Sequence, residues 1–163
     1  MSLSKFFEQY FWLIAMGTSA LNYIMTTRKA ESLPESDPRN TSEAKSLRLW
    51  VAATSVVPWI VMAIGLQFGN VPNIWSYFRP QDRHPFVLAW YVTVFLFAVA
   101  YAYWILFLGG AEKTIEFRPM SSGLARGNVA PTPKRVKLLA ALAPAWFVLW
   151  TLLVISMDVP VPK

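Results

Sequence analysis

The residues best suited to chemistry in this sequence lie together in one short stretch, Asp82-Arg83-His84. A carboxylate and an imidazole can share acid–base work or bind a metal ion. However, His84 is the only histidine and cysteine is absent, so a zinc site would need carboxylates as its other ligands and one chain cannot offer two histidines to a haem. Adjacent residues rarely form a catalytic pair, and no common hydrolase, zinc-protease or phosphate-loop motif occurs. We therefore predict a protein without catalytic residues, a metal site or a cofactor.

The sequence contains several long apolar stretches, and their central parts lack the ionisable residues by which pumps and proton carriers work. The central parts of its long apolar stretches contain no Asp, Glu, Lys or Arg. An ionisable residue at that depth is expensive and is kept for function, so its absence counts against a proton-coupled carrier. Glu8 is the nearest candidate, and we expect it to be a helix-start residue at the interface. Polar residues inside the apolar stretches include Asn22, Gln67, Thr93, Thr151 and Ser156.

The candidate residues named above lie within or between four apolar stretches, which cover residues 6–26, 49–68, 86–108 and 138–157. The chain is 55% hydrophobic and 15% charged, against roughly 45–50% and about 25% in soluble domains, which favours a bilayer as its solvent. Each stretch matches the roughly 20 residues that a helix needs to cross a hydrocarbon core about 30 Å thick. Irregular backbone cannot face lipid. We predict an all-α fold, a four-transmembrane-helix bundle that forms a single integral membrane domain over residues 1–163.

The first apolar stretch has an alternative interpretation as a cleaved signal peptide, because Thr18-Ser19-Ala20 resembles a cleavage site. Glu8 and the single basic residue Lys5 suit a signal peptide poorly, and the apolar run continues to Met25. We expect a helix that is retained.

The distribution of basic residues predicts the orientation of the chain. Eleven basic residues lie in the two long connections that follow the first and third stretches: Arg28, Lys29, Arg39, Lys45, Arg48, Lys113, Arg118, Arg126, Lys134, Arg135 and Lys137. The opposite side carries four: Lys5, Arg79, Arg83 and Lys163. The positive-inside rule then places both long connections in the cytoplasm and both termini outside. The net charge of +6 is therefore interpreted as orientation and contact with anionic lipid, and not as nucleic-acid binding.

The short connection between the second and third stretches is unusually aromatic, with Trp75, Tyr77 and Phe78. Such rings favour the headgroup region, so we expect an interfacial outer loop. We predict a ligand or partner surface here, together with one residue that follows the third stretch: Gln67, Asn70, Pro72, Trp75, Tyr77, Phe78, Arg79, Asp82, His84 and Glu112. Glu112 is also expected to form an ion pair with Lys113 or with a basic residue of another loop, since an acid near a helix C-terminus needs a cation.

Gly65 and Gly69 form a GxxxG pattern at the outer end of the second stretch. In membranes such small residues allow two backbones to approach closely, because lipid is as apolar as leucine and packing contacts replace the hydrophobic drive. The pattern predicts a close-packed face, either within one chain or between copies.

Residues 58–112 contain the segments PWIVMAIG, FGNVPNIWSYFRP, HPFVLAWY and YWILFLGGAE. This third of the chain resembles an uncharacterised group of small bacterial four-helix membrane proteins, whose pattern runs PWxVMGxG, FGGVPxxxxYFxP, NPFVLAFF and YWxFFxGGAE. Ala63 and Asn70 stand here for glycines and His84 for asparagine. The resemblance implies a bacterial inner membrane and no chemistry. It gives weight to Pro58, Trp59, Gly65, Gly69, Pro72, Tyr77, Phe78, Pro80, Pro85 and Glu112.

These observations favour a non-enzymatic integral membrane protein that binds a lipid or a membrane partner, for example as an accessory subunit. The expected partners are membrane lipids and either another protein or further copies of the chain, with no nucleic acid. One alternative is a small oligomeric channel or carrier with Gln67 and Asn70 near an outer vestibule. A second alternative is an interfacial enzyme that acts on lipid headgroups through Asp82 and His84.

Overall fold

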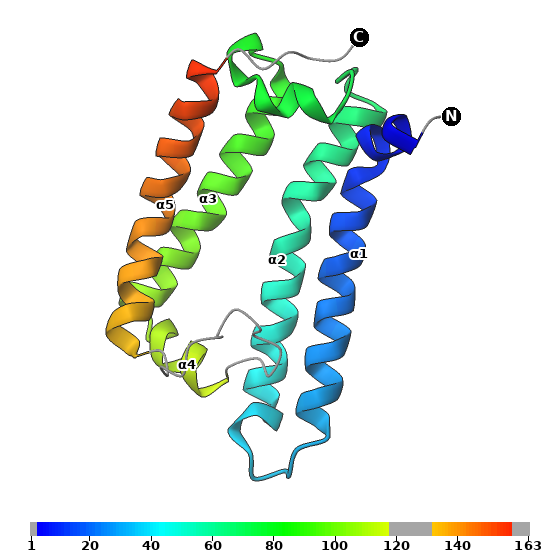
Figure 1. Cartoon of the computed structure of the whole chain (residues 1–163). Coiled ribbons are helices and arrows are strands. Elements are labelled where there is room, and N and C mark those ends of the chain that lie inside the picture. Colours follow the sequence, from blue (N-terminus) through cyan, green and yellow to red (C-terminus); the bar gives the residue numbers. More distant parts are fainter. Residues whose placement is uncertain (1–2, 118–131, 158–163) are drawn as a thin grey trace.

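The computed structural model describes residues 3–117 and 132–157, and all regular structure in these residues is helical. This confirms the all-α prediction for the described part of the chain. The elements are α1 (Leu3–Glu31), η1 (Pro38–Asn40), α2 (Ser42–Gln67), η2 (Ile74–Phe78), η3 (Pro80–Asp82), α3 (Pro85–Phe107), α4 (Gly110–Glu116) and α5 (Pro133–Ser156), where η marks a 3-10 helix. The four long helices run alternately up and down (Figure 1), so the start of α1 and the end of α5 lie at one end, with η2 and η3.

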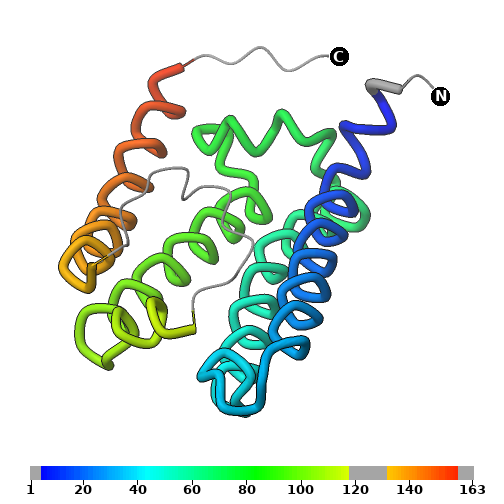
Figure 2. Tube along the Cα trace, turned by 60° about the horizontal axis from the view of Figure 1, so that its bottom comes forward, coloured from blue at the N-terminus to red at the C-terminus, as the bar shows by residue number. Residues whose placement is uncertain are grey.

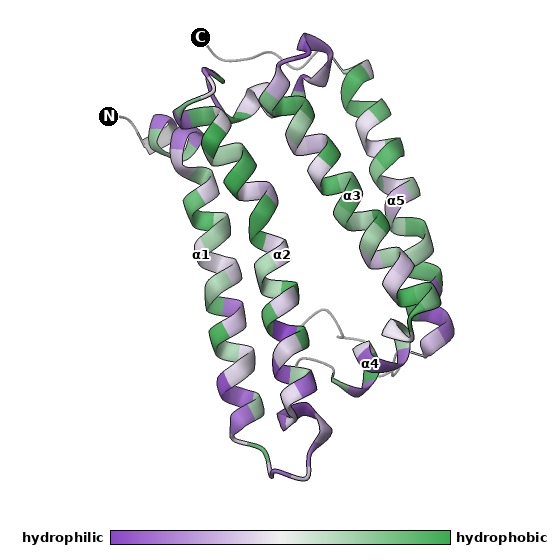
Figure 3. Cartoon of the chain, turned by 180° about the vertical axis from the view of Figure 1, so that it is seen from behind, coloured by the Kyte–Doolittle hydropathy of each residue, from purple (hydrophilic) through white to green (hydrophobic). Residues whose placement is uncertain are grey.

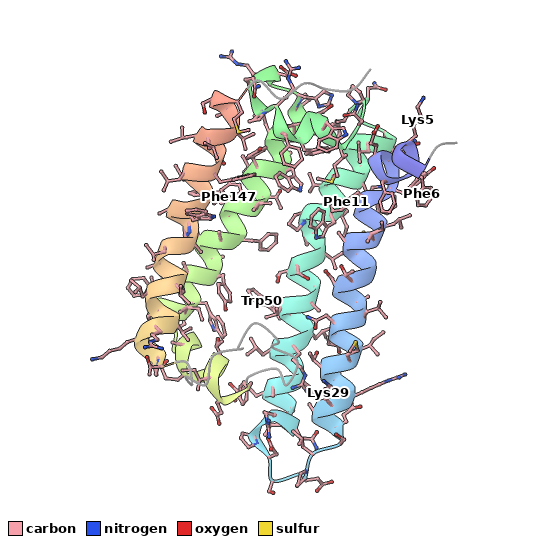
Figure 4. All side chains as sticks on the ribbon, in the orientation of Figure 1. Lys5, Phe6, Phe11, Lys29, Trp50 and Phe147 are labelled. Atoms are coloured by element: carbon pink, nitrogen blue, oxygen red, sulfur yellow. The ribbon has the colours of Figure 1, made fainter. Side chains whose placement is uncertain are left out.

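The long helices form two antiparallel pairs, α1 with α2 and α3 with α5. Within the first pair, Phe11 packs on Trp59 with ring centroids 5.9 Å apart. Within the second, Phe147 packs on Tyr91, also at 5.9 Å (Figure 4). The α2 and α3 helices join the two pairs near η2 and η3 and diverge toward the opposite end, where α4 lies across the opening (Figures 1 and 2).

Three helices in the described residues, α2, α3 and α5, are long and apolar enough to cross a membrane. Most of their apolar side chains face outward; Trp146 and Leu139 are 71% and 68% exposed. Monomeric soluble proteins rarely expose such continuous apolar surface, so these faces are suited to lipid. Figure 3 shows the same pattern, with hydrophobic residues along the helices and hydrophilic residues toward their ends. The α1 helix has 29 residues but is more polar, so the prediction of four spans is confirmed for three.

The helices begin and end where local capping allows, and not at the edge of the apolar stretch. The α2 helix starts at Ser42, seven residues before the predicted Leu49, because Thr41 accepts a hydrogen bond from the Ala44 amide at 3.3 Å. The α5 helix starts at Pro133, before the predicted residue 138, and Thr132 accepts from the Arg135 amide at 3.4 Å. Both helices therefore continue beyond the apolar stretch into polar sequence, because the hydrogen bonds within a helix form in water as well as in a membrane.

The two glycines of the GxxxG pattern lie beside the larger core cluster: Gly65 approaches its members Tyr77 and Val71, and Gly69 approaches Phe86, which packs against it. A Cβ atom added to Gly65 would meet the Tyr77 hydroxyl and would lie 2.9 Å from the Phe86 Cβ. One added to Gly69 would lie 2.6 Å from Cε2 of the Phe86 ring. The predicted close approach is therefore between the end of α2 and the outer loop with the first turn of α3, within one chain.

Candidate functional site

Nine of the ten residues predicted as a ligand or partner surface lie at one end of the molecule, where α2 ends and α3 begins. They do not form one continuous surface, because Tyr77 is buried. Its hydroxyl donates to the Met62 carbonyl at 3.2 Å, and the Tyr91 hydroxyl donates to the Tyr77 carbonyl at 3.0 Å. Burial raises the pKa of Tyr77 to about 12, so its hydroxyl keeps its proton at neutral pH. Tyr77 thus holds the outer loop onto α2.

Other members of the predicted surface are open: Gln67, Asn70, Pro72 and Trp75 are exposed, and Phe78 is half-buried. Asn70 has a positive φ of 57°, a conformation that asparagine tolerates better than most residues. These residues remain the predicted partner surface.

The charged residues of the outer loop do not form the Asp82–His84 pair that the enzyme alternative needs. Asp82 instead pairs with Arg79, with Nε and Oδ2 3.1 Å apart. His84 is half-buried at the start of α3, and its ring centroid lies 6.2 Å from that of Phe86. Among the described residues, no group of three or more acids or histidines lies close enough to hold a metal ion.

Glu112 lies at the opposite end of the molecule, on α4, and so does not belong to the outer loop surface. Its carboxylate lies 3.1 Å from the Lys137 ammonium on α5, so Glu112 has the cationic partner that was expected. The partner is neither Lys113 nor a residue of another loop, because Lys137 belongs to the same connection and lies near the start of α5. A hydrogen bond from its own backbone amide, followed by the contact with Lys137, lowers the pKa of Glu112. Lys113 pairs with Glu43 of α2. The two ion pairs tie α4 to both helical pairs.

Between the helical pairs, at this second end, lies a cavity of about 440 Å³. Four elements supply its walls. The lining residues are Ser19, Asn22, Tyr23 and Thr26 of α1; Ala44, Leu47, Arg48, Val51, Ala52 and Ser55 of α2; Tyr101 and Trp104 of α3; and Thr114 and Phe117 of α4 and its end. The volume falls in the range of roughly 300–1,000 Å³ that is usual for small-molecule sites.

A polar stripe on α1 forms one wall of this cavity. Ser19, Asn22, Tyr23 and Thr26 recur at intervals of three, one and three residues, which places them on one face of a helix. The Ser19 hydroxyl donates to the Ala15 carbonyl at 3.1 Å and the Thr26 hydroxyl to the Asn22 carbonyl at 2.8 Å, so each keeps a lone pair for the cavity. These residues lower the hydropathy of α1 and point inward. The stripe was not predicted as such from the sequence, although the spacing of these four residues at helical intervals could have indicated it.

Among the described residues that line the cavity, Arg48 is the one with a cationic side chain. Its Nη1 donates to the Arg39 carbonyl at 2.8 Å. Arg39 is itself fixed by Asp37, whose carboxylate lies 2.7 Å from Nη2 and whose pKa falls to about 2 because Arg39 donates hydrogen bonds to it. The Arg48 Nε and Nη2 atoms are shielded and have no partner within the described part of the chain. Arg48, which lines the cavity, therefore keeps two N–H donors that have no acceptor among the described residues.

Two other hollows border the structure. One of about 320 Å³ shares Leu47, Trp104 and Phe117 with the main cavity and extends it toward Trp50 (Figure 4). The other, of about 480 Å³, lies at the outer end between η3, α3 and α5, and is more open. Its cation, Arg83, is exposed. The main cavity is thus the better enclosed and the one with convergent polar groups.

No protein-family model, curated protein or solved structure matches this chain. The resemblance to the bacterial group stays a prediction, and the functional argument depends on the cavity itself.

Proposed function

We propose that this chain is a non-enzymatic integral membrane protein that binds a membrane lipid in the cavity between α1, α2, α3 and α4. The observation that carries the proposal is the 440 Å³ cavity lined by the inward polar stripe of α1 and by Arg48 of α2. An apolar pocket with a few convergent polar groups is the usual form of a binding site.

The proposal includes four membrane crossings. At about 1.5 Å per residue, the 29 residues of α1 extend over about 43 Å, enough to cross a bilayer. Its contacts are mainly with α2, which runs beside it and is itself apolar enough to span. The polar stripe of α1 faces the cavity, so lipid meets its more apolar sides. With the basic connections in the cytoplasm, as in a bacterial inner membrane, both termini lie outside.

The depth of the cavity favours a lipid over a water-soluble ligand. Ser19 and Ser55 line the cavity and lie inside the predicted apolar stretches, whereas Arg48 and Thr114 lie at their cytoplasmic ends. A ligand that fills this space must place one part among the helices and another at the headgroup level. Amphipathic molecules of the bilayer have that form.

The proposal can be tested by filling the cavity. Ala52 lines it, whereas its neighbour Ala53 is exposed and lies outside the lining. We expect Ala52→Trp to lower the amount of co-purified lipid by about tenfold, a loss of about 1.4 kcal/mol of binding free energy. Ala53→Trp adds the same side chain on the side that faces the bilayer, so this variant should keep the wild-type amount of co-purified lipid.

The measurement is the amount of each lipid per protein after purification in mild detergent, by mass spectrometry of the intact complex and of the extract. Melting temperatures of both variants check their folding. Equal lipid retention by both folded variants would refute the proposal.

A further inference from the structure

We propose that the bound lipid is an anionic phospholipid of the cytoplasmic leaflet and that Arg48 recognises its phosphate. This inference rests on the proposed function and specifies the chemistry of the ligand.

The first argument is the depth of Arg48 along α2. The helix starts at Ser42, so Arg48 lies six residues, or about 9 Å, from its start. It directly precedes the apolar stretch of residues 49–68. Arg48 therefore lies at the boundary between headgroups and acyl chains, the depth at which a phosphodiester is found and at which long basic side chains are tolerated in a membrane.

The second argument is the geometry of the unused donors. Nη1 is occupied by the Arg39 carbonyl, which leaves Nε and Nη2. These two N–H groups lie along the same edge of the planar guanidinium and point in parallel, the arrangement that binds two oxygens of one phosphate or carboxylate. The contact with the Arg39 carbonyl restrains the guanidinium of Arg48, a residue that lines the cavity. A guanidinium held in place loses little conformational entropy on binding.

The third argument is charge. The described residues that line the cavity include neither Asp nor Glu. Three acids of the adjoining elements have cationic partners: Asp37 has Arg39, Glu43 has Lys113, and Glu112 has Lys137. Glu116, which precedes the lining residue Phe117, is exposed. A shielded cation without a partner is unfavourable, so the site gains most from a ligand that brings net negative charge. A zwitterionic headgroup would also bring an ammonium for which the lining provides no carboxylate.

The experiment compares lipids that differ in headgroup charge. Wild-type protein in detergent is titrated with fluorescent dioleoyl phosphatidylglycerol, phosphatidylethanolamine and phosphatidylcholine at fixed, low ionic strength. We expect phosphatidylglycerol to bind at least about tenfold more tightly than either zwitterionic lipid. Arg48→Gln should remove this preference by weakening phosphatidylglycerol about tenfold while the other two lipids change little. Arg48→Lys keeps the positive charge but lacks the two parallel N–H donors, so it should retain part of the preference for phosphatidylglycerol.

Lys45→Gln is the matched control, because Lys45 is an exposed cation one turn earlier on α2 and lies outside the cavity lining. It should leave all three affinities unchanged, which separates recognition in the cavity from general surface charge. Inorganic phosphate is added as a competitor. If it displaces phosphatidylglycerol, the ligand is a free anion and the proposal of a bound lipid is overturned.

Several outcomes would overturn the inference and leave the proposed function intact. These are equal affinity of wild type for the three lipids, a preference for phosphatidylcholine, or unchanged phosphatidylglycerol binding by Arg48→Gln. In each case Ala52→Trp would still weaken lipid binding by about tenfold. If Ala52→Trp also binds like wild type, the proposed function itself fails. Should Arg48→Gln not fold, the headgroup comparison on wild type and Arg48→Lys decides the question.

Discussion

Replacing Gly65 with alanine would place a methyl group in a closely packed position near the end of α2. The added Cβ would meet the Tyr77 hydroxyl and lie 2.9 Å from the Phe86 Cβ. Overpacking of a core costs about 1–3 kcal/mol. Displacement of Tyr77 would also weaken its hydrogen bond to the Met62 carbonyl, worth about 1 kcal/mol. We therefore expect a loss of about 2–4 kcal/mol, or a melting temperature lower by roughly 5–10 °C.

The assay is thermal unfolding of the purified protein in detergent, followed by size-exclusion chromatography. Gly17→Ala is the matched control, since Gly17 also lies inside a long helix but has no atoms within 4 Å of the added Cβ. This control should melt at the wild-type temperature or slightly above it, because alanine favours a helix over glycine. Because the contacts lie within one chain, Gly65→Ala should elute as wild type does.

A double variant tests the mechanism. Tyr77→Phe removes the hydroxyl that the new methyl group would meet, so Gly65→Ala with Tyr77→Phe should lose less stability than the sum of the single changes. Additive losses would show that the hydroxyl is not the obstacle. An unchanged melting temperature for Gly65→Ala alone would refute the packing argument, and Gly65 would then belong to a surface that faces lipid.

Three further predictions concern topology, pH and the outer loop. In intact cells a single cysteine at Ser76 should react with an impermeant thiol reagent and one at Ser36 should not; the reverse pattern would invert the orientation, and the native chain has no cysteine to interfere. The pKa of Glu112 is lowered in the folded protein by the hydrogen bond from its own backbone amide and then by its contact with Lys137, so these two contacts should stabilise the fold above the unfolded-state pKa and lose this effect as pH falls through the folded pKa. Glu112→Gln should therefore make the melting temperature depend less on pH in the acidic range, and a pH profile identical to that of wild type would contradict this role of the carboxylate. His84→Ala should leave lipid binding and melting nearly unchanged, whereas loss of function in a folded variant would support the enzyme alternative.

The sequence alone determined that the chain is helical and suited to a membrane. Stretches of about 20 apolar residues have few other stable forms, because lipid offers no partners for exposed backbone. It also determined the uneven distribution of basic residues. It did not give the helix limits, because α2 starts at Ser42 through the Thr41 cap and not at the first apolar residue. Capping depends on single hydrogen bonds that hydropathy does not report.

The role of the glycine pair was only half accessible from sequence. Spacing indicated close packing at Gly65 and Gly69, but the partners, Tyr77 and Phe86, come from the outer loop and α3. Likewise, the aromatic loop looked like one interfacial surface, while folding buries Tyr77 against α2 and leaves Trp75 exposed. Which side of a loop residue faces inward depends on the surfaces that other segments bring to it.

The cavity was decided by tertiary structure. In the sequence Arg48 is one of eleven basic residues on the predicted cytoplasmic side, and nothing local distinguishes it from Lys45. Folding separates them: Lys45 is exposed, whereas Arg48 lies beside the polar stripe of α1 and is held by the Arg39 carbonyl. The cavity itself exists because α2 and α3 diverge and α4 lies across the opening. That divergence follows from contacts between helices distant in sequence, which composition and periodicity do not encode.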